Sequence, residues 1–347
     1  MTASVTAHRR ALAYCAGGGI GDSLMASVAA RALHERFAAV DALTLPGHLE
    51  ALLRVPDFDD VLTDEGGDEA QLAAQLHTRG YDACIVTWAT ARTARVPQRA
   101  GIPVRAGQAR RLYSWRFTHR VPVRSETGDV TTHWSQIMLD YARALDCDTH
   151  DAAPRFIPND TDRSQAAALL DRLHLAPGAY VILHPTNAIA PARGVWPVRG
   201  WAALARGLRE TFDAPVLLTG AAQDVEINAA IVREAVCDGI HDLAGKTDIG
   251  AFGALAQSAR LFAGITTGSM HVAAAVGAPT VGIFPFQTDT PERWAPIGAR
   301  TAIVRATYPC RPGERKETCP DYACIENLDV PRVVSAAKSL LSASPLR

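Results

Sequence analysis

A glycine-rich stretch near the start of the chain leads into a single carboxylate. Gly17, Gly18, Gly19 and Gly21 let the backbone turn tightly, and Asp22 stands at the mouth of a predicted helix. In a partly desolvated site, this carboxylate could act as a general base that takes the proton from an attacking hydroxyl. Asp is also a preferred helix cap, so the motif alone leaves both roles open.

The same stretch has a rival interpretation as a dinucleotide-binding loop. Such a loop requires a third glycine at the position of Asp22. A carboxylate there would repel the pyrophosphate that the loop has to hold. The sequence therefore argues against NAD.

A second stretch predicts an anion site. Thr266, Thr267, Gly268 and His271 lie between a predicted buried strand and a helix of small residues. Backbone N–H groups at a helix N-terminus can hold a diphosphate, and His271 could donate a further hydrogen bond. A single His beside a small apolar helix is more often structural, but the succession of strand, glycine turn and helix favours ligand binding.

Two further loops place polar side chains after predicted strands. Thr186 and Asn187 follow the strand 180–184, and Arg193 in the same loop could complement the charge of a phosphate leaving group. Asp224 follows another strand and could accept hydrogen bonds from a ribose. Arg193 could equally be a solvated surface residue, and Asp224 an acidic residue that stabilises a helix N-terminus.

Strands and helices that alternate along the whole chain must position these loops. Apolar runs of strand length alternate with helical spacing, which is the pattern of parallel sheets covered by helices. A chain of 347 residues exceeds the size of one hydrophobic core, and the polar stretch 146–162 suits a linker. The sequence predicts an α/β fold of two doubly wound, Rossmann-like domains facing a central cleft, with domains at 1–155 and 163–328 and a C-terminal helix at 329–347.

The stretch from Arg92 to Glu126 is rich in Arg and Pro. It shows little periodicity, so it is predicted to be an irregular surface excursion that could bind an acceptor. Arg110 and Arg111 are interleaved with aromatic residues and could meet a phosphorylated acceptor or the surface of the inner membrane. A solvated loop is the alternative.

The composition is that of a soluble globular protein. With 48% hydrophobic and 20% charged residues and a formal net charge of −1, the chain has no charge excess for nucleic-acid binding. The segment Met1–Arg10 is polar and basic, and the apolar run after it is too short for a secretory signal or a membrane span. The sequence therefore predicts a cytoplasmic protein.

The seven cysteines are expected to be reduced thiols. Cys310, Cys319 and Cys324 form the only cluster, and their spacing lacks the paired CxxC or the companion His of a zinc site. A metal or redox role for this cluster is the lesser alternative. No DxD-like acidic motif of the kind that binds magnesium is evident near the proposed cleft, which favours metal-independent chemistry.

Three stretches together resemble a known family. Gly19-Ile20-Gly21-Asp22 is similar to its amino-terminal Gly-Asp loop, and 184–201 to its HPG…KxWP…W stretch. The segments DLAGKT at 242–247 and TTGSMHVAAA at 266–275 resemble its most specific signature, DLxGKT followed by DTGxxHxAAA. The family is glycosyltransferase family 9, the ADP-heptose:lipopolysaccharide heptosyltransferases.

This resemblance implies a GT-B fold and a reaction. The enzyme would move a sugar, heptose in the family, from an ADP-sugar donor to an acceptor hydroxyl on a glycan, a glycolipid or another molecule, as in lipopolysaccharide core or related glycan assembly. The transfer would invert the anomeric configuration and need no metal, and no cofactor is implied beyond the donor itself.

The resemblance also implies roles for single residues. The amino-terminal domain would bind the acceptor, with Asp22 as the catalytic base, and the predicted acceptor-side residues are Gly19, Gly21, Arg110 and Arg111. The carboxyl-terminal domain would hold the nucleotide. Its implied contacts are Thr267, Gly268 and His271 with the diphosphate, Asp224 with the ribose and Thr247 with the adenine.

Two positions depart from the family pattern. Thr266 replaces the signature Asp, and the Lys before Trp-Pro is absent, with Arg193 the nearest cation. Loss of the carboxylate removes a hydrogen-bond acceptor for donor-sugar hydroxyls, which predicts an altered donor sugar. A nucleotide-sugar epimerase of similar fold and a catalytically silent sugar-nucleotide-binding protein are the alternatives.

Overall fold

The computed structural model describes residues 9–185, 196–288, 290–311 and 319–343. Contacts between Cα atoms divide the chain into two compact units, Met1–Ile157 and Pro158–Arg347. The division falls inside the predicted linker 146–162. Each unit is built on one parallel sheet, and the prediction of an α/β fold with two doubly wound units is confirmed.

The first unit has a six-stranded sheet in the order β3-β2-β1-β4-β5-β6. Its central strand β1 is apolar and buried throughout Ala11–Tyr14, as expected of a parallel strand that is covered on both faces. The strands are β1 (Arg10–Tyr14), β2 (Ala39–Thr44), β3 (Val61–Thr63), β4 (Ala83–Val86), β5 (Val104–Gln108) and β6 (His119–Val121).

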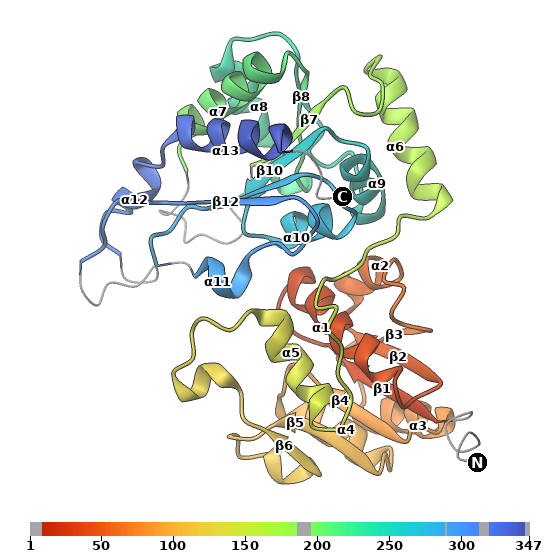
Figure 1. The fold of residues 1–347 in the computed structure, drawn as a ribbon. Coiled ribbons are helices and arrows are strands. Elements are labelled where there is room, and N and C mark those ends of the chain that lie inside the picture. The colour runs from red at the N-terminus through yellow and green to blue at the C-terminus, as the bar shows by residue number, and fades with distance from the viewer. Residues whose placement is uncertain (1–8, 186–195, 289, 312–318, 344–347) are drawn as a thin grey trace. The chain divides into compact units, whose positions relative to one another are not determined.

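Helices cover both faces of this sheet. Helix α1 packs on α5 and helix α3 on α4, with the two pairs on opposite faces (Figure 1). The helices are α1 (Ile20–Leu33), α2 (Leu49–Leu52), α3 (Glu69–Arg79), α4 (Ala91–Arg99) and α5 (Trp134–Arg143).

The second unit repeats the plan with the strand order β12-β11-β10-β7-β8-β9. Helices α7, α8 and α13 pack together, and α9 packs on both α6 and α10 (Figure 1). The strands are β7 (Val181–His184), β8 (Val216–Leu218), β9 (Ile240–Asp242), β10 (Leu261–Ile265), β11 (Thr280–Phe284) and β12 (Thr301–Arg305). The helices are α6 (Asp160–Arg172), α7 (Val198–Phe212), α8 (Val225–Ala235), α9 (Ile249–Gln257), α10 (Gly268–Ala275), α11 (Pro291–Trp294), α12 (Ala323–Glu326) and α13 (Val330–Ser342).

The prediction of an irregular excursion over 92–126 is wrong. This stretch contains α4, β5 and β6, with the loop 109–118 between the two strands. Helix α4 begins at a capping Thr90, whose hydroxyl accepts a hydrogen bond from the Thr93 amide. Arg92 and Arg95 in this helix form ion pairs with acidic residues of the preceding segments, so arginines that suggested a solvated loop in fact hold a helix in place.

Both sheets reverse their strand order at one point. In the first unit the reversal lies between β1 and β4, and in the second between β7 and β10. Doubly wound sheets bind ligands at such a point, beyond the carboxyl ends of the strands. The loops after these four strands are therefore the places where a ligand is expected. None of the helices described combines the length and hydropathy that a membrane crossing requires.

Candidate functional site

The glycine loop of the first unit holds the Asp22 carboxylate at the carboxyl end of β1. Gly19 caps α1, and its amide donates a hydrogen bond to Oδ2 of Asp22 over 2.8 Å. Asp22 is thus a helix-capping residue, one of the two roles that the sequence left open. A carboxylate can accept about four hydrogen bonds, so the contact with the Gly19 amide leaves Asp22 able to accept others.

The surroundings of Asp22 favour its protonated form more than water does. Burial raises the pKa of this carboxyl, and the opposing effects of the Gly19 amide, the Trp134 side chain and the charge of His48 do not cancel that rise. A carboxylate with a raised pKa is a stronger base than an ordinary surface Asp. Asp22 therefore has the electrostatic environment of a general base.

The loop approaches a tryptophan as closely as glycine allows. A Cβ on Gly17 would lie 2.1 Å from the Trp88 ring, and a Cβ on Gly18, which has a φ of +69°, would lie 2.5 Å from the Asp22 carboxylate. Both positions thus require glycine, the first for close approach and the second for its backbone conformation as well. The consequence is that Asp22 and Trp88 lie against the same short loop.

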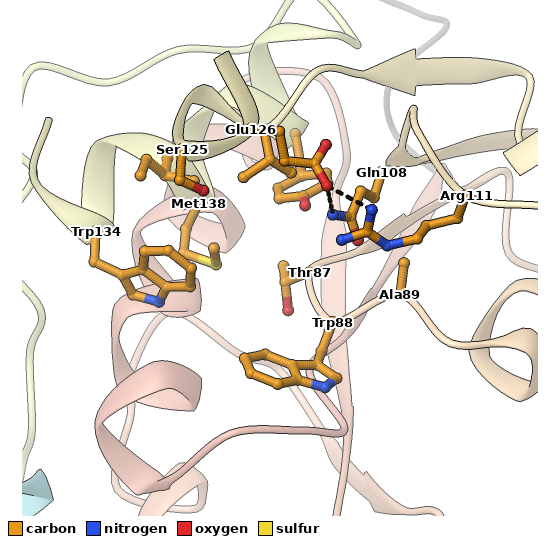
Figure 2. Close-up of a pocket in the computed structure, with 12 residues that line it drawn as sticks. Thr87, Trp88, Ala89, Gln108, Arg111, Ser125, Glu126, Trp134 and Met138 are labelled. Atoms are coloured by element: carbon orange, nitrogen blue, oxygen red, sulfur yellow. Dashed lines mark hydrogen bonds and ion pairs between the residues drawn. The ribbon is translucent and has the colours of Figure 1, made fainter. Parts of the chain in front are cut away.

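Trp88 lines a pocket of about 280 Å³ within the first unit. Figure 2 shows Trp88 and Trp134 along it, with Glu126, Gln108 and Arg111 beyond them. The lining residues are Thr87, Trp88, Ala89, Gln108, Arg111, Val123, Ser125, Glu126, Trp134, Ile137, Met138 and Tyr141. Because Trp134 also acts on the pKa of Asp22, the pocket is adjacent to the candidate base.

The charges in this pocket are paired. Nη1 of Arg111 lies 2.6 Å from Oε1 of Glu126, and the Gln108 amide donates to the same oxygen over 2.8 Å. Arg110 is exposed and does not line the pocket; its guanidinium reaches the Glu126 main-chain carbonyl at 3.4 Å. Of the two predicted acceptor-side arginines, the structure brings Arg111 alone into the pocket.

Most residues of this pocket were not predicted from the sequence. Thr87 and Trp88 directly follow β4, one of the two strands at the order reversal, and that position is the signal that could have identified them. Trp134 comes from α5, far along the chain, and His48 accepts or donates a hydrogen bond with Ser23 at 2.9 Å. Their proximity to Asp22 results from packing between helices, which no local pattern predicts.

In the second unit, the predicted anion site lies at the strand-order reversal. Helix α10 begins at Gly268, directly after β10, with Thr267 as its extended N-cap residue. Within the part of the chain that the structure describes, neither the Gly268 nor the Ser269 amide donates a hydrogen bond. These two amides at a helix N-terminus can bind an anion such as a diphosphate.

The other residues of this segment are held by the sheet and the helix. The Thr266 hydroxyl donates to the Ile283 carbonyl at 3.3 Å, and the Thr267 hydroxyl to the Ile265 carbonyl at the same distance. His271 lies one turn into α10 and is buried. Thr266, in the position of the family's Asp, therefore directs its proton to a neighbouring strand.

The loops after β8 and β9 are joined to each other. The Gly245 amide donates to the Gly220 carbonyl at 2.9 Å, and Gly245 has a φ of +68° that favours glycine. Asp224 is buried in the first of these loops, where its Oδ2 accepts from the Ala221 amide at 2.8 Å, and Thr247 is half-buried in the second. The structure thus brings the loops of Asp224 and Thr247 together, with Asp224 in the capping role.

A buried histidine ends β7. Burial lowers the pKa of His184 to about 4, so its ring is neutral at physiological pH, and its Nδ1 lies 2.9 Å from the Thr219 hydroxyl. The three predicted donor-side residues that follow, Thr186, Asn187 and Arg193, lie outside the described residues.

The cysteine cluster does not form a metal site among the residues described. Over residues 9–185, 196–288, 290–311 and 319–343, no group of three or more His, Cys, Asp or Glu side chains has the arrangement of a metal site. Cys324 is buried, and the Cys319 sulfur accepts a hydrogen bond from the Tyr322 amide at 3.3 Å.

Several solved structures have the same fold. ADP-heptose lipopolysaccharide heptosyltransferase II of E. coli aligns with a TM-score of 0.77 at 22% identity, over 96% of this chain and 98% of that one. A family 9 glycosyltransferase from Veillonella parvula gives 0.82 at 17% identity over 97% and 98%. The E. coli heptosyltransferase WaaC with ADP gives 0.71 at 16% identity over 95% and 99%. These likenesses show the GT-B fold.

The family itself follows from the sequence. A comparison with curated proteins found no match. The model of the family described as glycosyltransferase family 9 (heptosyltransferase) matches residues 70–323, which is more than half of the chain. The match begins after Asp22, so the role of this residue rests on the geometry above. The chain belongs to glycosyltransferase family 9, the heptosyltransferase family, and is a glycosyltransferase.

Proposed function

We propose that this glycosyltransferase moves a sugar from an ADP-sugar donor to an acceptor hydroxyl, with inversion and without a metal. Asp22 would take the proton from the acceptor hydroxyl as its oxygen attacks the anomeric carbon. The bond between that carbon and the diphosphate oxygen would break, and ADP would leave with the bonding electrons. One displacement of this kind inverts the configuration.

The observation that carries this proposal is the environment of Asp22. Its carboxylate is fixed by the Gly19 amide, has a pKa raised by burial, and stands beside a pocket with aromatic walls. Trp88, Trp134 and Tyr141 supply apolar walls for an acceptor, while Thr87 and Gln108 supply polar groups. Since Arg111 is paired with Glu126, the pocket suits an uncharged sugar.

The donor side of the proposal rests on α10. The unused amides of Gly268 and Ser269 would bind the diphosphate and stabilise the charge that develops on it as the bond breaks. Thr267 and His271 are proposed as further diphosphate contacts, Asp224 as a ribose contact and Thr247 as an adenine contact. Thr186, Asn187 and Arg193 are proposed donor-side residues on the basis of sequence alone.

The identity of the transferred sugar depends on Thr266. Its hydroxyl proton is directed to the Ile283 carbonyl, so this position offers a donor sugar a weaker acceptor than a carboxylate would. We propose a heptose or a sugar that lacks the hydroxyl which an Asp would bind. The acceptor hydroxyl would belong to a glycan or a glycolipid, and a glycolipid acceptor would bring the enzyme to the inner surface of the membrane.

The test is transfer from ADP-heptose to a panel of methyl glycosides and bacterial glycolipids, with and without EDTA. We expect a product whose amount is unchanged by EDTA and whose new linkage, by NMR, has the opposite anomeric configuration to the donor. Retained configuration or a requirement for added divalent metal would contradict the proposed mechanism. ADP binding without product from any acceptor, with ADP-heptose and with other ADP-sugars as donors, would instead indicate a silent binding protein.

A further inference from the structure

The first unit carries an unusual concentration of positive charge. From Ala83 to Ser125 the chain contains no Asp or Glu and nine arginines, although the whole chain has a net charge of −1. The arginines are Arg92, Arg95, Arg99, Arg105, Arg110, Arg111, Arg116, Arg120 and Arg124. Five of them form ion pairs with acidic residues elsewhere in the unit: Arg92, Arg95, Arg99, Arg111 and Arg124.

The remaining arginines are concentrated in and beside the loop between β5 and β6. Arg105, Arg110, Arg116 and Arg120 form no ion pair with any residue that the structure describes. Arg110 and Arg120 are exposed to solvent. This segment therefore presents positive charge that the protein itself does not neutralise.

The same loop exposes two large apolar side chains. Leu112 is 98% exposed and Trp115 is 59% exposed, and the Arg116 guanidinium lies 4.2 Å from the centre of the Trp115 ring. A single exposed Leu is ordinary, but Leu and Trp between unpaired arginines form the combination that binds the interface of an anionic bilayer. Trp side chains are enriched at the level of the lipid headgroups, and Arg side chains bind lipid phosphates.

Contacts of other side chains anchor the loop while Leu112 and Trp115 stay exposed. The Ser114 hydroxyl donates to the Gln108 carbonyl at 2.6 Å, the Tyr113 hydroxyl to the Ala89 carbonyl at 2.5 Å, and Phe117 packs closely over Gly107. Leu112 and Trp115 take no part in this anchoring. Between them and Arg110 lies Arg111, which lines the pocket beside Asp22.

We infer that residues 110–120 form a docking surface for a bilayer that contains anionic lipids, with Leu112 and Trp115 entering the interface and Arg110, Arg116 and Arg120 binding headgroups. The biological role of this surface rests on the proposed function, because the docked loop would bring the pocket beside Asp22 to an acceptor carried by a lipid. The proposed function leaves open which surface of the protein would contact that membrane, and residues 110–120 would supply it.

The experiment is cosedimentation of the full chain with phosphatidylcholine vesicles, with and without phosphatidylglycerol. We expect binding that requires phosphatidylglycerol and weakens with salt. The double variant Leu112→Ser/Trp115→Ser should lower the partition coefficient at least about tenfold, and Arg120→Glu about tenfold. The matched controls Val236→Ser, at an exposed apolar residue of the second unit, and Arg172→Glu, at an exposed arginine, should bind as the wild type does.

Failure of this inference is distinguishable from failure of the proposed function. Vesicle binding that is absent, or unchanged in the loop variants, while ADP binding persists would overturn the docking surface alone. Binding to a single-stranded RNA oligonucleotide that exceeds vesicle binding and ignores Leu112→Ser/Trp115→Ser would also overturn it, because the surface would then be a polyanion site. Vesicle binding without any ADP binding would leave the docking surface in place and contradict the donor assignment.

Discussion

Asp22→Asn is expected to lower kcat for sugar transfer by about 100- to 10,000-fold, the range in which general-base catalysis contributes. Asparagine keeps the size of the side chain and an oxygen that can accept the Gly19 amide, but it cannot take a proton. The wild-type kcat/KM should also fall on acidification with an apparent pKa above the usual range of Asp, because burial raises the pKa of this carboxyl and only its ionised form is a base. Steady-state kinetics across pH provide the measurement.

The chain offers a close control for this substitution. Asp162 occupies the same third position of α6 and accepts a hydrogen bond from the Asn159 amide at 2.8 Å, the same distance as between Asp22 and Gly19. Asp162→Asn should change the free energy of unfolding by a similar amount, about 1 kcal/mol, without affecting kcat. Equal kcat values for the two variants would reduce Asp22 to a helix cap.

Gly268→Pro is expected to weaken ADP binding by about 10- to 100-fold. Proline removes the amide hydrogen at the first position of α10, where the helix itself does not use it, and its fixed φ suits that position. The extended conformation of Thr267, with φ −136° and ψ 173°, also tolerates a following proline. The predicted loss corresponds to one hydrogen bond to a charged group, about 1.5–3 kcal/mol.

Calorimetric titration with ADP is the measurement, with Gly268→Ala as the control that removes the glycine but keeps the amide hydrogen. Thermal unfolding should show that the proline variant is folded. If Gly268→Pro and Gly268→Ala bind ADP with the same affinity, the amide of residue 268 does not contact the diphosphate.

The positions that the sequence predicted best are those whose signals are local. A glycine loop between a strand and a helix can be recognised in the sequence because its backbone conformation requires glycine. Gly18 and Gly245 show this with their positive φ angles. Such loops fall at the carboxyl ends of strands, and the parallel sheets then assemble them at one edge. Asp22, Asp224 and Gly268 lie in loops of this kind, and their proposed roles remain predictions.

What the sequence did not predict depends on contacts between distant segments. The strands β3, β5, β6 and β12 went unrecognised. β3, β6 and β12 lie at the edges of their sheets, β3 and β6 have three residues each, and β5 lies in the arginine-rich stretch that was predicted to be irregular. Helix α4 was missed because Pro97 and its arginines suggested a loop, whereas Asp64 and Glu69 neutralise those arginines. The pocket beside Asp22 required Trp134 of α5, whose place no nearby residue indicates.

The sequence could not distinguish a capping role from a functional role for Asp22 or Asp224, because an Asp at a helix N-terminus suits both. The structure shows both Asp22 and Asp224 capping their own loops, with nearly the same geometry. They differ in their surroundings, because Asp22 stands beside the aromatic pocket, where burial raises the pKa of its carboxyl, and Asp224 does not line that pocket. The tertiary structure is therefore needed to tell a helix cap from a catalytic base. Asp22 caps its helix, and we propose that it is also the base.

An ADP-sugar donor is the central element of the proposed reaction, and calorimetric titration of the wild-type protein with ADP, UDP and GDP tests it directly. We predict that ADP binds at least about tenfold more tightly than UDP or GDP, which corresponds to about 1.4 kcal/mol of discrimination by the adenine site. Binding of UDP or GDP with equal or higher affinity than ADP, or no binding of any of the three, would contradict the proposed ADP-sugar donor.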